Sequence, residues 1–377
     1  MVRTLAATLV LVLARPALAA EPRARDLGIP FDFGAPGRWN AITDVPGVEV
    51  GHTTLIEGDS VRTGVTAILP RGKGDAARQP CLGGYFSMNG NGEMTGIHWV
   101  EESGAVEGPI VITNTNAVGL VRDAVISYAA RRWPPKGGQW TVWSLPIVAE
   151  TWDGDLNDIY GMHVKADHLF ATLDGAAGGP VAEGGVGGGT GMICYEFKGG
   201  IGTSSRVLAA KEGSYTVGVL VQANHGLRHQ LKIGGLPMGL ELRDGLVRAK
   251  DSGSIIIVVA TDAPILPHQL KRLARRAALG LARTGSVAGN GSGDIFLAFS
   301  TANAAAAAED SRVVDVRMLP NDAMGPLFEA TVGATEEAII NALVAGRTMK
   351  GFRGNTVVGL PHDKVRAILK RHALLVE

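Results

Sequence analysis

The sequence predicts an α+β fold in which helices cover antiparallel or mixed sheets. Candidate strands and helices are intermixed along the whole chain, without the regular strand–helix alternation of a parallel α/β fold. Apolar residues make up 46% of the 377 residues and charged residues only 19%, which is typical of a chain that buries a sizeable core. The 52 glycines cluster in short stretches between apolar runs, which indicates many tight turns and close backbone approaches.

Four segments have the composition of strands. Residues 46–52 follow a Pro-Gly turn and alternate apolar with polar side chains, as a strand with one solvated face does. Residues 108–113 and 215–221 are rich in β-branched or apolar side chains. Residues 255–260 are six consecutive apolar residues, and we expect them to form a central strand.

Helices are predicted at four further places. Residues 120–132 and 361–370 have helical patterns, and residues 269–283 carry leucines and alanines on one face and basic residues mostly on the other. Thr335 is a candidate N-cap for a helix whose first turn holds two glutamates. Their negative charge would be stabilised by the positive end of the helix dipole.

Charge and motif content exclude several classes of function. The 36 basic and 36 acidic residues balance, so no electrostatic feature points to nucleic acid or an anionic membrane as partner. The sequence contains no Walker A motif, no HExxH zinc motif and no GxSxG nucleophile elbow, and we expect neither metal nor organic cofactor. The two cysteines, Cys81 and Cys194, could form one disulfide in an exported protein, but two buried thiols are the preferred interpretation.

The N-terminus resembles a secretory signal peptide. A short basic region with Arg3 precedes an apolar run over residues 5–14 and then the small residues Ala17 and Ala19 around Leu18. A plain N-terminal helix is the alternative, and the run is too short to span a bilayer. We expect cleavage near Ala19 or Ala20, with residues 1–20 removed and the protein periplasmic or secreted.

The strongest chemical signal is Ser254, where a polar stretch meets the apolar run 255–260 abruptly. A turn residue is one interpretation. The other is an N-terminal nucleophile, because a serine hydroxyl can attack the preceding carbonyl and Gly253 leaves that carbonyl sterically open. Cleavage would then expose an α-amine with an ordinary pKa of about 7.7–8.0, which can act as general base for its own hydroxyl near neutral pH.

Several segments together resemble the family of L-aminopeptidase/D-alanine esterase-amidases, the DmpA family, which includes the β-aminopeptidases. They occur in order along the chain: NAITDVPGV (40–48), VAEGGVGGGTGM (181–192), GGIGTSSR (199–206), VQANHG (221–226), GSIIIVVATDAP (253–264), PHQL (267–270) and GSGD (291–294). The resemblance implies an αββα four-layer sandwich similar to N-terminal-nucleophile hydrolases. It also implies self-cleavage between Gly253 and Ser254, leaving an α chain of residues 21–253 and a β chain of residues 254–377 that together form one catalytic domain.

The resemblance also implies roles for individual residues. Ser254 would be the nucleophile and Asn224, placed after the strand 215–221, would donate to the oxyanion of the reacting carbonyl. Ser292 and Asp294, placed in the loop after the helix 269–283, would hold the amine and hydroxyl of Ser254. Some relatives carry Glu at the position of Asp294, whose side chain is shorter.

A substrate site is implied by two further segments. Glu150 would bind the free ammonium of the substrate, which would make the enzyme an aminopeptidase. Trp152 stands where relatives can carry Tyr, so no phenol hydroxyl is available there. Glycines of the segment 187–191 would line the pocket, among them Gly188, Gly189 and Gly191. Residues 89–93 and 114–116 are weaker candidates for the same pocket, and His225 is the histidine that we would place near the chemistry.

These observations predict a self-processing serine aminopeptidase acting on short peptides, amino acid amides or esters, including D-alanine or β-amino acid derivatives, with its αβ units assembled into a homo-oligomer. One alternative is an acyltransferase of related fold, although ornithine acetyltransferases use threonine as nucleophile and work inside the cell. The other is an uncleaved secreted binding protein in which the glycines and serines only form turns.

Overall fold

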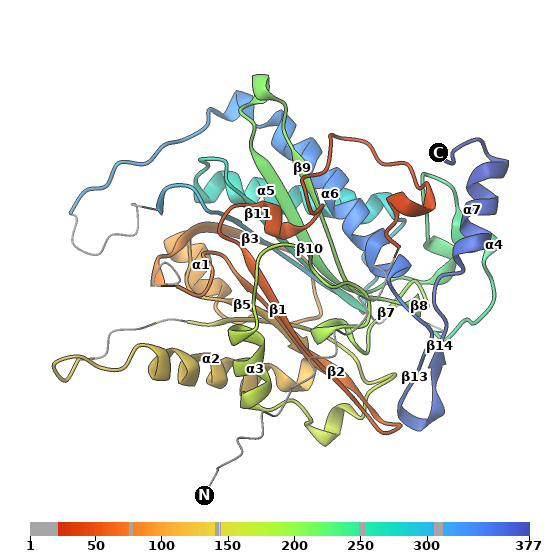
Figure 1. Ribbon diagram of the computed structural model, residues 1–377, viewed down its shortest axis with the longest axis horizontal. Coiled ribbons are helices and arrows are strands. Elements are labelled where there is room, and N and C mark those ends of the chain that lie inside the picture. Colours follow the sequence, from red (N-terminus) through yellow and green to blue (C-terminus); the bar gives the residue numbers. More distant parts are fainter. Residues whose placement is uncertain are drawn as a thin grey trace, which may run out of the picture.

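The protein has two sheets packed face to face, with helices on both outer faces (Figure 1). The computed structural model describes residues 22–74, 78–139, 143, 145–248, 250, 253–304 and 312–377. The predicted signal segment, residues 1–20, lies outside the described residues.

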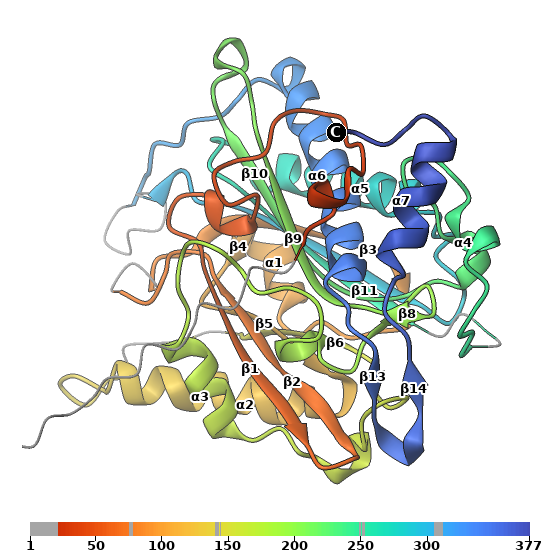
Figure 2. The same cartoon turned by 45° about the vertical axis from the view of Figure 1, so that its right-hand side comes forward.

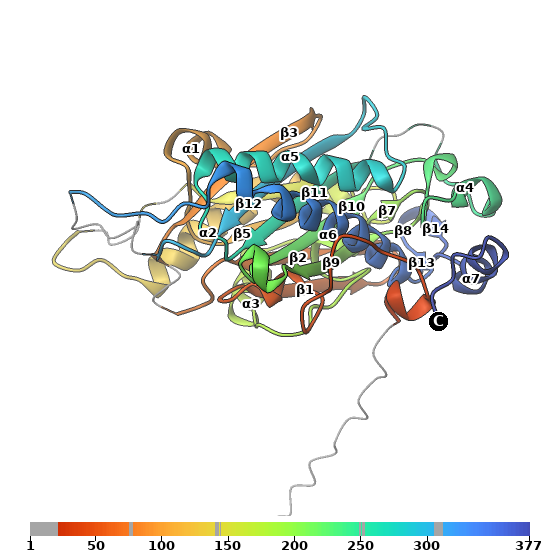
Figure 3. The same ribbon diagram turned by 90° about the horizontal axis from the view of Figure 1, so that it is seen from above.

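The larger sheet has six strands in the order β4-β3-β12-β11-β10-β9. Its strands are β4 (Ala105–Val106), β3 (Cys81–Gly90), β12 (Gly293–Ser300), β11 (Ser254–Thr261), β10 (Thr216–Asn224) and β9 (Gly200–Val207). The sheet is mixed, because β11 runs parallel to β12 and antiparallel to β10. Helices α5 (Pro267–Arg283) and α6 (Gly325–Val344) lie side by side across its outer face (Figure 3).

The smaller sheet has four strands in the order β1-β2-β5-β6. Its strands are β1 (Glu49–Glu57), β2 (Val61–Leu69), β5 (Ile110–Asn114) and β6 (Ile147–Thr151). Helices α2 (Val118–Arg132) and α3 (Ala166–Asp174) pack against this sheet on the side away from the six-stranded sheet (Figure 2).

Three apolar cores separate the four layers, and the alternating side chains of β11 show why. Ile255, Ile257 and Val259 belong to the core beneath α5 and α6, whereas Ile256 and Val258 belong to the core between the two sheets. A third core lies between the four-stranded sheet and its helices. Since both faces of β11 are buried, its sequence is continuously apolar. The predicted αββα sandwich and the central position of this strand are confirmed.

The remaining elements lie around the two sheets. They are α1 (Ile97–Ser103), α4 (Met238–Glu241), α7 (His362–Arg371), the hairpin of β7 (Ile193–Cys194) and β8 (Phe197–Lys198), and the pair β13 (Met349–Lys350) and β14 (Thr356–Val357). Within the described ranges, no helix combines the length and apolar character needed to cross a membrane. Cys81 on β3 and Cys194 on β7 are both buried thiols, in agreement with the preferred interpretation.

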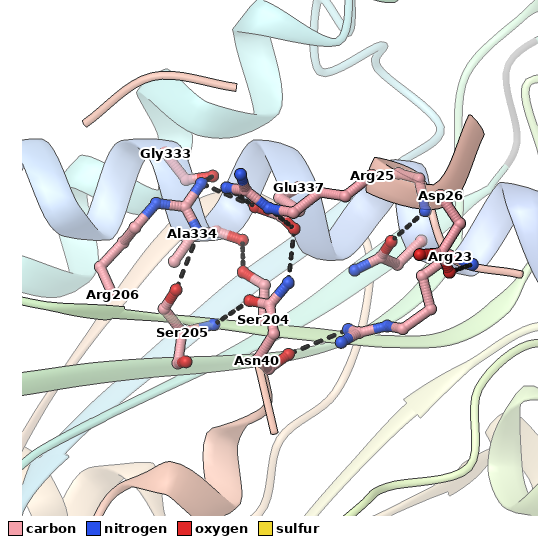
Figure 4. Close-up of polar contacts among 12 residues, drawn as sticks. Arg23, Arg25, Asp26, Asn40, Ser204, Ser205, Arg206, Gly333, Ala334 and Glu337 are labelled. Atoms are coloured by element: carbon pink, nitrogen blue, oxygen red, sulfur yellow. Dashed lines mark hydrogen bonds and ion pairs between the residues drawn. The ribbon is translucent and has the colours of Figure 1, made fainter. Parts of the chain in front are cut away.

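The predicted helix start at Thr335 is wrong, because α6 begins at Gly325 and Thr335 lies in its interior. This helix is buried on nearly all sides, so it lacks the one-sided apolar pattern that marks the ends of an amphipathic helix. The two glutamates that follow Thr335 contact arginines and do not lie at the positive end of a helix dipole. Glu337 contacts Arg206 on β9 and Arg25 of the N-terminal segment, which lies beside α6 (Figure 4).

Candidate active site

Three adjacent strands of the large sheet bring the predicted catalytic residues to one edge. Ser254 is the first residue of β11 and lies opposite Asn224, the last residue of β10. On the other side of β11, Ile255 pairs with Asp294 of β12. Strand register therefore brings together three residues that are far apart in the sequence, as the resemblance implied.

The hydroxyl of Ser254 points toward the start of β12. Its Oγ accepts a hydrogen bond from the backbone N–H of Gly293 at 3.1 Å, and only 6% of the residue is exposed. A backbone donor at this distance restrains the position of the hydroxyl oxygen. The role of Ser254 as nucleophile stays a prediction.

Asn224 is fully buried, and its contacts determine the orientation of its amide. The Oδ1 atom accepts hydrogen bonds from the Ile193 N–H at 2.7 Å and from Arg248 Nη2 at 3.2 Å. The Nδ2 group donates to the carbonyl of Trp152 at 2.9 Å, which uses one of its two hydrogens. Trp152 thus meets Asn224 through its backbone, while its half-buried indole packs over Gly154.

Ser292 and Asp294 form a buried pair at the start of β12. The Ser292 hydroxyl donates to Asp294 Oδ1 at 2.6 Å, and both residues are at least 99% buried. The expectation that both lie in a loop is wrong for Asp294, which is the second residue of β12 because its backbone pairs with both neighbouring strands. The hydrogen bond to Ser254 Oγ comes from the backbone of Gly293, which lies between these two residues in the sequence.

Glu150 reaches the same edge from the other sheet. It lies near the end of β6, 4% exposed, and accepts hydrogen bonds from the Glu93 N–H at 2.9 Å and from the Thr115 hydroxyl. Burial raises the pKa of Glu150, and these hydrogen bonds lower it only in part. A Cβ built on Gly92 would lie 3.3 Å from Glu150 Oε1 and 3.2 Å from the Cα of Gly293, so this single glycine separates Glu150 from the backbone beside Ser254.

The weaker candidate segments also reach this edge. In residues 89–93, Asn89 pairs with Asp294 and Glu93 donates to Glu150. In residues 114–116, Thr115 is the hydroxyl donor to Glu150, and Asn114 donates to the Thr63 hydroxyl at 2.8 Å. Both segments therefore support the acidic side chain of the site.

The glycine-rich segment is packed between the two sheets. Gly188 and Gly189 lie in a short 3₁₀ turn and, like Gly191, are buried. A Cβ on Gly188 would approach the Ile112 carbonyl oxygen to 2.7 Å, and one on Gly191 would lie 2.8 Å from the Cβ of Asp153, so neither position has room for a side chain. The Gly188 N–H donates to the Thr66 hydroxyl at 3.1 Å. Contact between this segment and substrate stays a prediction.

His225 lies next to Asn224 but has no acid–base role in this arrangement. Its ring packs edge-on against Tyr195, with Nδ1 3.9 Å from the Cys194 sulfur. Burial and, to a smaller extent, the nearby charge of Arg248 lower the pKa of His225 to about 3. The ring is therefore neutral at physiological pH. The described part of the chain contains no group of three or more His, Cys, Asp or Glu side chains suited to a metal ion.

Comparison with known proteins identifies the family. Residues 40–357 match the model of Peptidase family S58. The chain belongs to this family. It is 52% identical to the beta-peptidyl aminopeptidase BapA of Sphingosinicella microcystinivorans, over 97% of this chain and 96% of that protein.

Two solved structures are similar over almost their whole length. A Burkholderia sp. β-aminopeptidase matches with a TM-score of 0.86 and 51% identity, covering 93% of this chain and 99% of that one. The L-aminopeptidase D-Ala-esterase/amidase of Ochrobactrum anthropi, described as a prototype of the serine aminopeptidases and a variant of the Ntn hydrolase fold, matches with a TM-score of 0.89 and 45% identity, covering 94% and 100%. The predicted family, the Ntn-hydrolase-like fold and the assignment as a serine aminopeptidase are confirmed.

Two buried side chains of this S58 peptidase escaped the sequence analysis. Lys198, fully buried at the end of β8, donates from Nζ to the carbonyls of Gly189 at 3.2 Å, Met192 at 3.0 Å and Gly199 at 2.7 Å. Burial lowers its pKa to about 7. Arg248 contacts Asn224 from the segment before Ser254. A single lysine or arginine outside a periodic helix or strand has no sequence pattern that marks it as buried. For Lys198, the only available signal was its position close to the glycine-rich segment in the sequence.

Proposed function

We propose that this chain is a self-processing aminopeptidase that cuts its own bond between Gly253 and Ser254 and then uses Ser254 as an N-terminal nucleophile. The observation that carries the proposal is the position of Ser254, at the start of a buried strand with its Oγ held by the Gly293 N–H and flanked by Asn224 and Asp294. Membership of family S58 supports the same reaction class.

Self-cleavage proceeds by an acyl shift followed by hydrolysis. The Oγ of Ser254 attacks the carbonyl carbon of Gly253, a C–O bond forms, and the peptide C–N bond breaks while the hydroxyl proton passes to the departing nitrogen. Water then hydrolyses the resulting ester, which leaves a carboxylate on Gly253 and restores the hydroxyl of Ser254. The product is an α chain ending at Gly253 and a β chain that begins with a free α-amine.

The same hydroxyl then reacts with substrate. The α-amine of Ser254, with an ordinary pKa of about 7.7–8.0, takes the hydroxyl proton as Oγ attacks the substrate carbonyl, and the protonated amine returns a proton to the leaving group. Asn224 has a second Nδ2 hydrogen available for the developing oxyanion, and a preorganised donor there contributes about 3–4 kcal/mol to lowering the barrier. Water hydrolyses the acyl-enzyme and releases the N-terminal residue.

Glu150 supplies the specificity for a free N-terminus. Its carboxylate is buried and adjacent to the Ser254 edge, where an ammonium group would form a charge-assisted hydrogen bond that an internal peptide bond cannot form. We propose short peptides, amides and esters as substrates, with N-terminal β-amino acids among the preferred residues. Two relatives at about half identity, named β-aminopeptidases, support this choice over D-alanine derivatives.

Export and assembly complete the proposal. The basic, apolar and small-residue regions of residues 1–20 support secretion to the periplasm or the medium. We propose that the α and β chains stay associated, because β11 and β12 pair with β10 and β3 inside one sheet, and that the αβ units form a homo-oligomer.

The decisive experiment is intact-mass spectrometry of the wild type, Ser254→Ala and the matched control Ser252→Ala. Two polypeptides in the wild type and the control, with residue 254 at the N-terminus of the smaller, together with one uncut chain in Ser254→Ala, are expected. An uncut wild type would contradict the proposal and favour a binding protein.

A panel of free-amine amides, assayed with and without added acceptor amines, then distinguishes hydrolysis from acyl transfer. Predominant transfer of the acyl group would favour an acyltransferase.

A further inference from the structure

The side chain of Arg248 is buried against the cleavage site in the uncut chain. It lies six residues before Ser254, and its side chain is 5% exposed. Its guanidinium donates from Nη2 to Asn224 Oδ1 at 3.2 Å, and from Nη1 to the carbonyls of Asn224 at 3.4 Å and Ile193 at 3.3 Å. These contacts surround the residue that faces Ser254 across β10 and β11.

Two acidic residues hold Arg248 in this position. The Glu196 carboxylate accepts the backbone N–H groups of Val247 and Arg248, both at 2.9 Å. Burial alone would raise the pKa of Glu196, but the backbone hydrogen bonds from Arg248, Arg228 and Val247, together with the charge of Arg228, bring it below its ordinary value, so the carboxylate is charged at neutral pH. Asp155 forms an ion pair with Nη2 at 3.3 Å. Both the backbone and the side chain of Arg248 are therefore anchored by charge.

The guanidinium also lies beside the glycine whose carbonyl is attacked. A Cβ built on Gly253 would be 2.7 Å from Nη1 of Arg248 and closer still to the carbonyl oxygen of Asn224. This position therefore has no room for a side chain, and the guanidinium lies close to the Cα of the residue whose carbonyl is attacked.

Attack on the Gly253 carbonyl places negative charge on its oxygen, which a fixed cation stabilises. Neighbouring groups are poorly suited to supply that charge. His225 is neutral, and Lys198 directs its ammonium to three carbonyls of the glycine-rich segment. The guanidinium of Arg248 is a planar cation fixed by its fork of hydrogen bonds.

We propose that Arg248 is a positioning residue for self-cleavage, which orients the Asn224 amide and the Gly253 backbone for attack by Ser254 and provides the positive charge beside the scissile bond. The inference rests on the proposed self-processing. Arg248 lies near the C-terminal end of the future α chain, so this segment would assist the cleavage that releases it. The mature enzyme, which acts on external substrates, does not need this assistance.

The test compares processing rates of the full chain. The half-time for appearance of the two polypeptides is measured by intact mass after rapid purification of the wild type, Arg248→Gln, Arg248→Lys and Arg243→Gln. The last is the matched control, because Arg243 is exposed and, among the described residues, donates to the nearby Leu240 carbonyl. We expect Arg248→Gln to process about 10- to 100-fold more slowly, as for loss of a charged hydrogen-bond donor, and Arg248→Lys to recover part of that loss. Arg243→Gln should match the wild type.

A chemical rescue separates positioning from folding. Millimolar guanidinium, well below denaturing concentrations, should accelerate processing of Arg248→Ala and leave the wild type unchanged. Processing of Arg248→Gln at the wild-type rate would overturn the inference, and so would a loss of the native thermal transition in Arg248→Gln combined with Ser254→Ala. These outcomes differ from failure of the proposed function, which would appear as an uncut wild type.

Discussion

Replacement of Glu337 by glutamine tests the buried ion cluster that joins the two future chains. The Glu337 and Arg206 side chains are fully buried and 2.8 Å apart. Arg25 adds two hydrogen bonds to the same carboxylate, at 2.7 and 2.8 Å, and Asn40 adds a third at 2.6 Å (Figure 4). Arg25 and Arg206 would belong to the α chain and Glu337 to the β chain, so the cluster would tie the processed enzyme together.

The expected loss of stability follows from the burial of Arg206. Removing one partner of a buried pair leaves an uncompensated charge, which destabilises the fold by roughly 3–5 kcal/mol. With an unfolding entropy of about 2.1 cal/mol/K per residue, this corresponds to a Tm lower by roughly 4–7 °C for a chain of this length. Glutamine keeps the size and one acceptor oxygen, so the loss reports charge more than packing.

The pH dependence gives a second signature. Burial by itself would raise the pKa of Glu337, but the hydrogen bond from Arg25 and the charges of Arg206 and Arg25 outweigh it and hold the pKa below its ordinary value. The stabilisation is therefore fully present above the ordinary carboxyl pKa of about 4.3, and it is lost as the pH falls through the lower, folded-state pKa. The difference in Tm between wild type and variant should shrink only in that acid range.

The assay is thermal unfolding in the uncut Ser254→Ala background, where unfolding involves one chain. The control is Asp244→Asn, which removes an exposed ion pair with Lys364 and should leave Tm unchanged within error. A Glu337→Gln variant with the Tm of the control, or a Tm difference that persists unchanged through the acid range, would refute the reasoning.

Two further predictions concern buried titratable groups. Burial lowers the pKa of Lys198 to about 7 from its ordinary 10.5, so the unfolded chain binds the extra proton and wild-type stability should rise between pH of about 7 and 10. Lys198→Met should show a flatter rise in Tm over this range than exposed Lys211→Met, and equal slopes would count against it. Glu150→Gln should lower kcat/KM on free-amine amides about 10- to 100-fold, as for loss of a charge-assisted hydrogen bond. Because burial raises the pKa of Glu150, the wild-type kcat/KM profile should contain an acid-side ionisation above ordinary carboxyl values in addition to that of the Ser254 amine. Glu150→Gln should lose this ionisation and keep that of the amine, while exposed Glu101→Gln should keep both.

Local patterns in the sequence predicted the elements on which the site is built. The apolar run that follows Ser254 lies in β11. The amphipathic pattern at 269–283 corresponds to α5 to within two residues. Both predictions depend only on neighbouring residues, because a strand buried on both faces is apolar throughout and a helix buried on one face is periodic. α6, buried almost all round, has no such contrast, and its N-cap was misplaced by eleven residues.

The motifs of the sequence led to the family, the nucleophile and the candidate partners Asn224, Ser292 and Asp294, yet not to their contacts. Only strand register places Asn224 opposite Ser254, and only the pairing of two sheets with Gly92 between them brings Glu150 to the same edge. The position of Arg248 against Asn224 also depends on the tertiary structure, since a single arginine in a loop has no periodic or motif signal. The sequence by itself determined which residue types are present and which segments are apolar. The tertiary structure decided which side chains meet, because contacts between residues distant in the chain arise from packing and register and not from local preference.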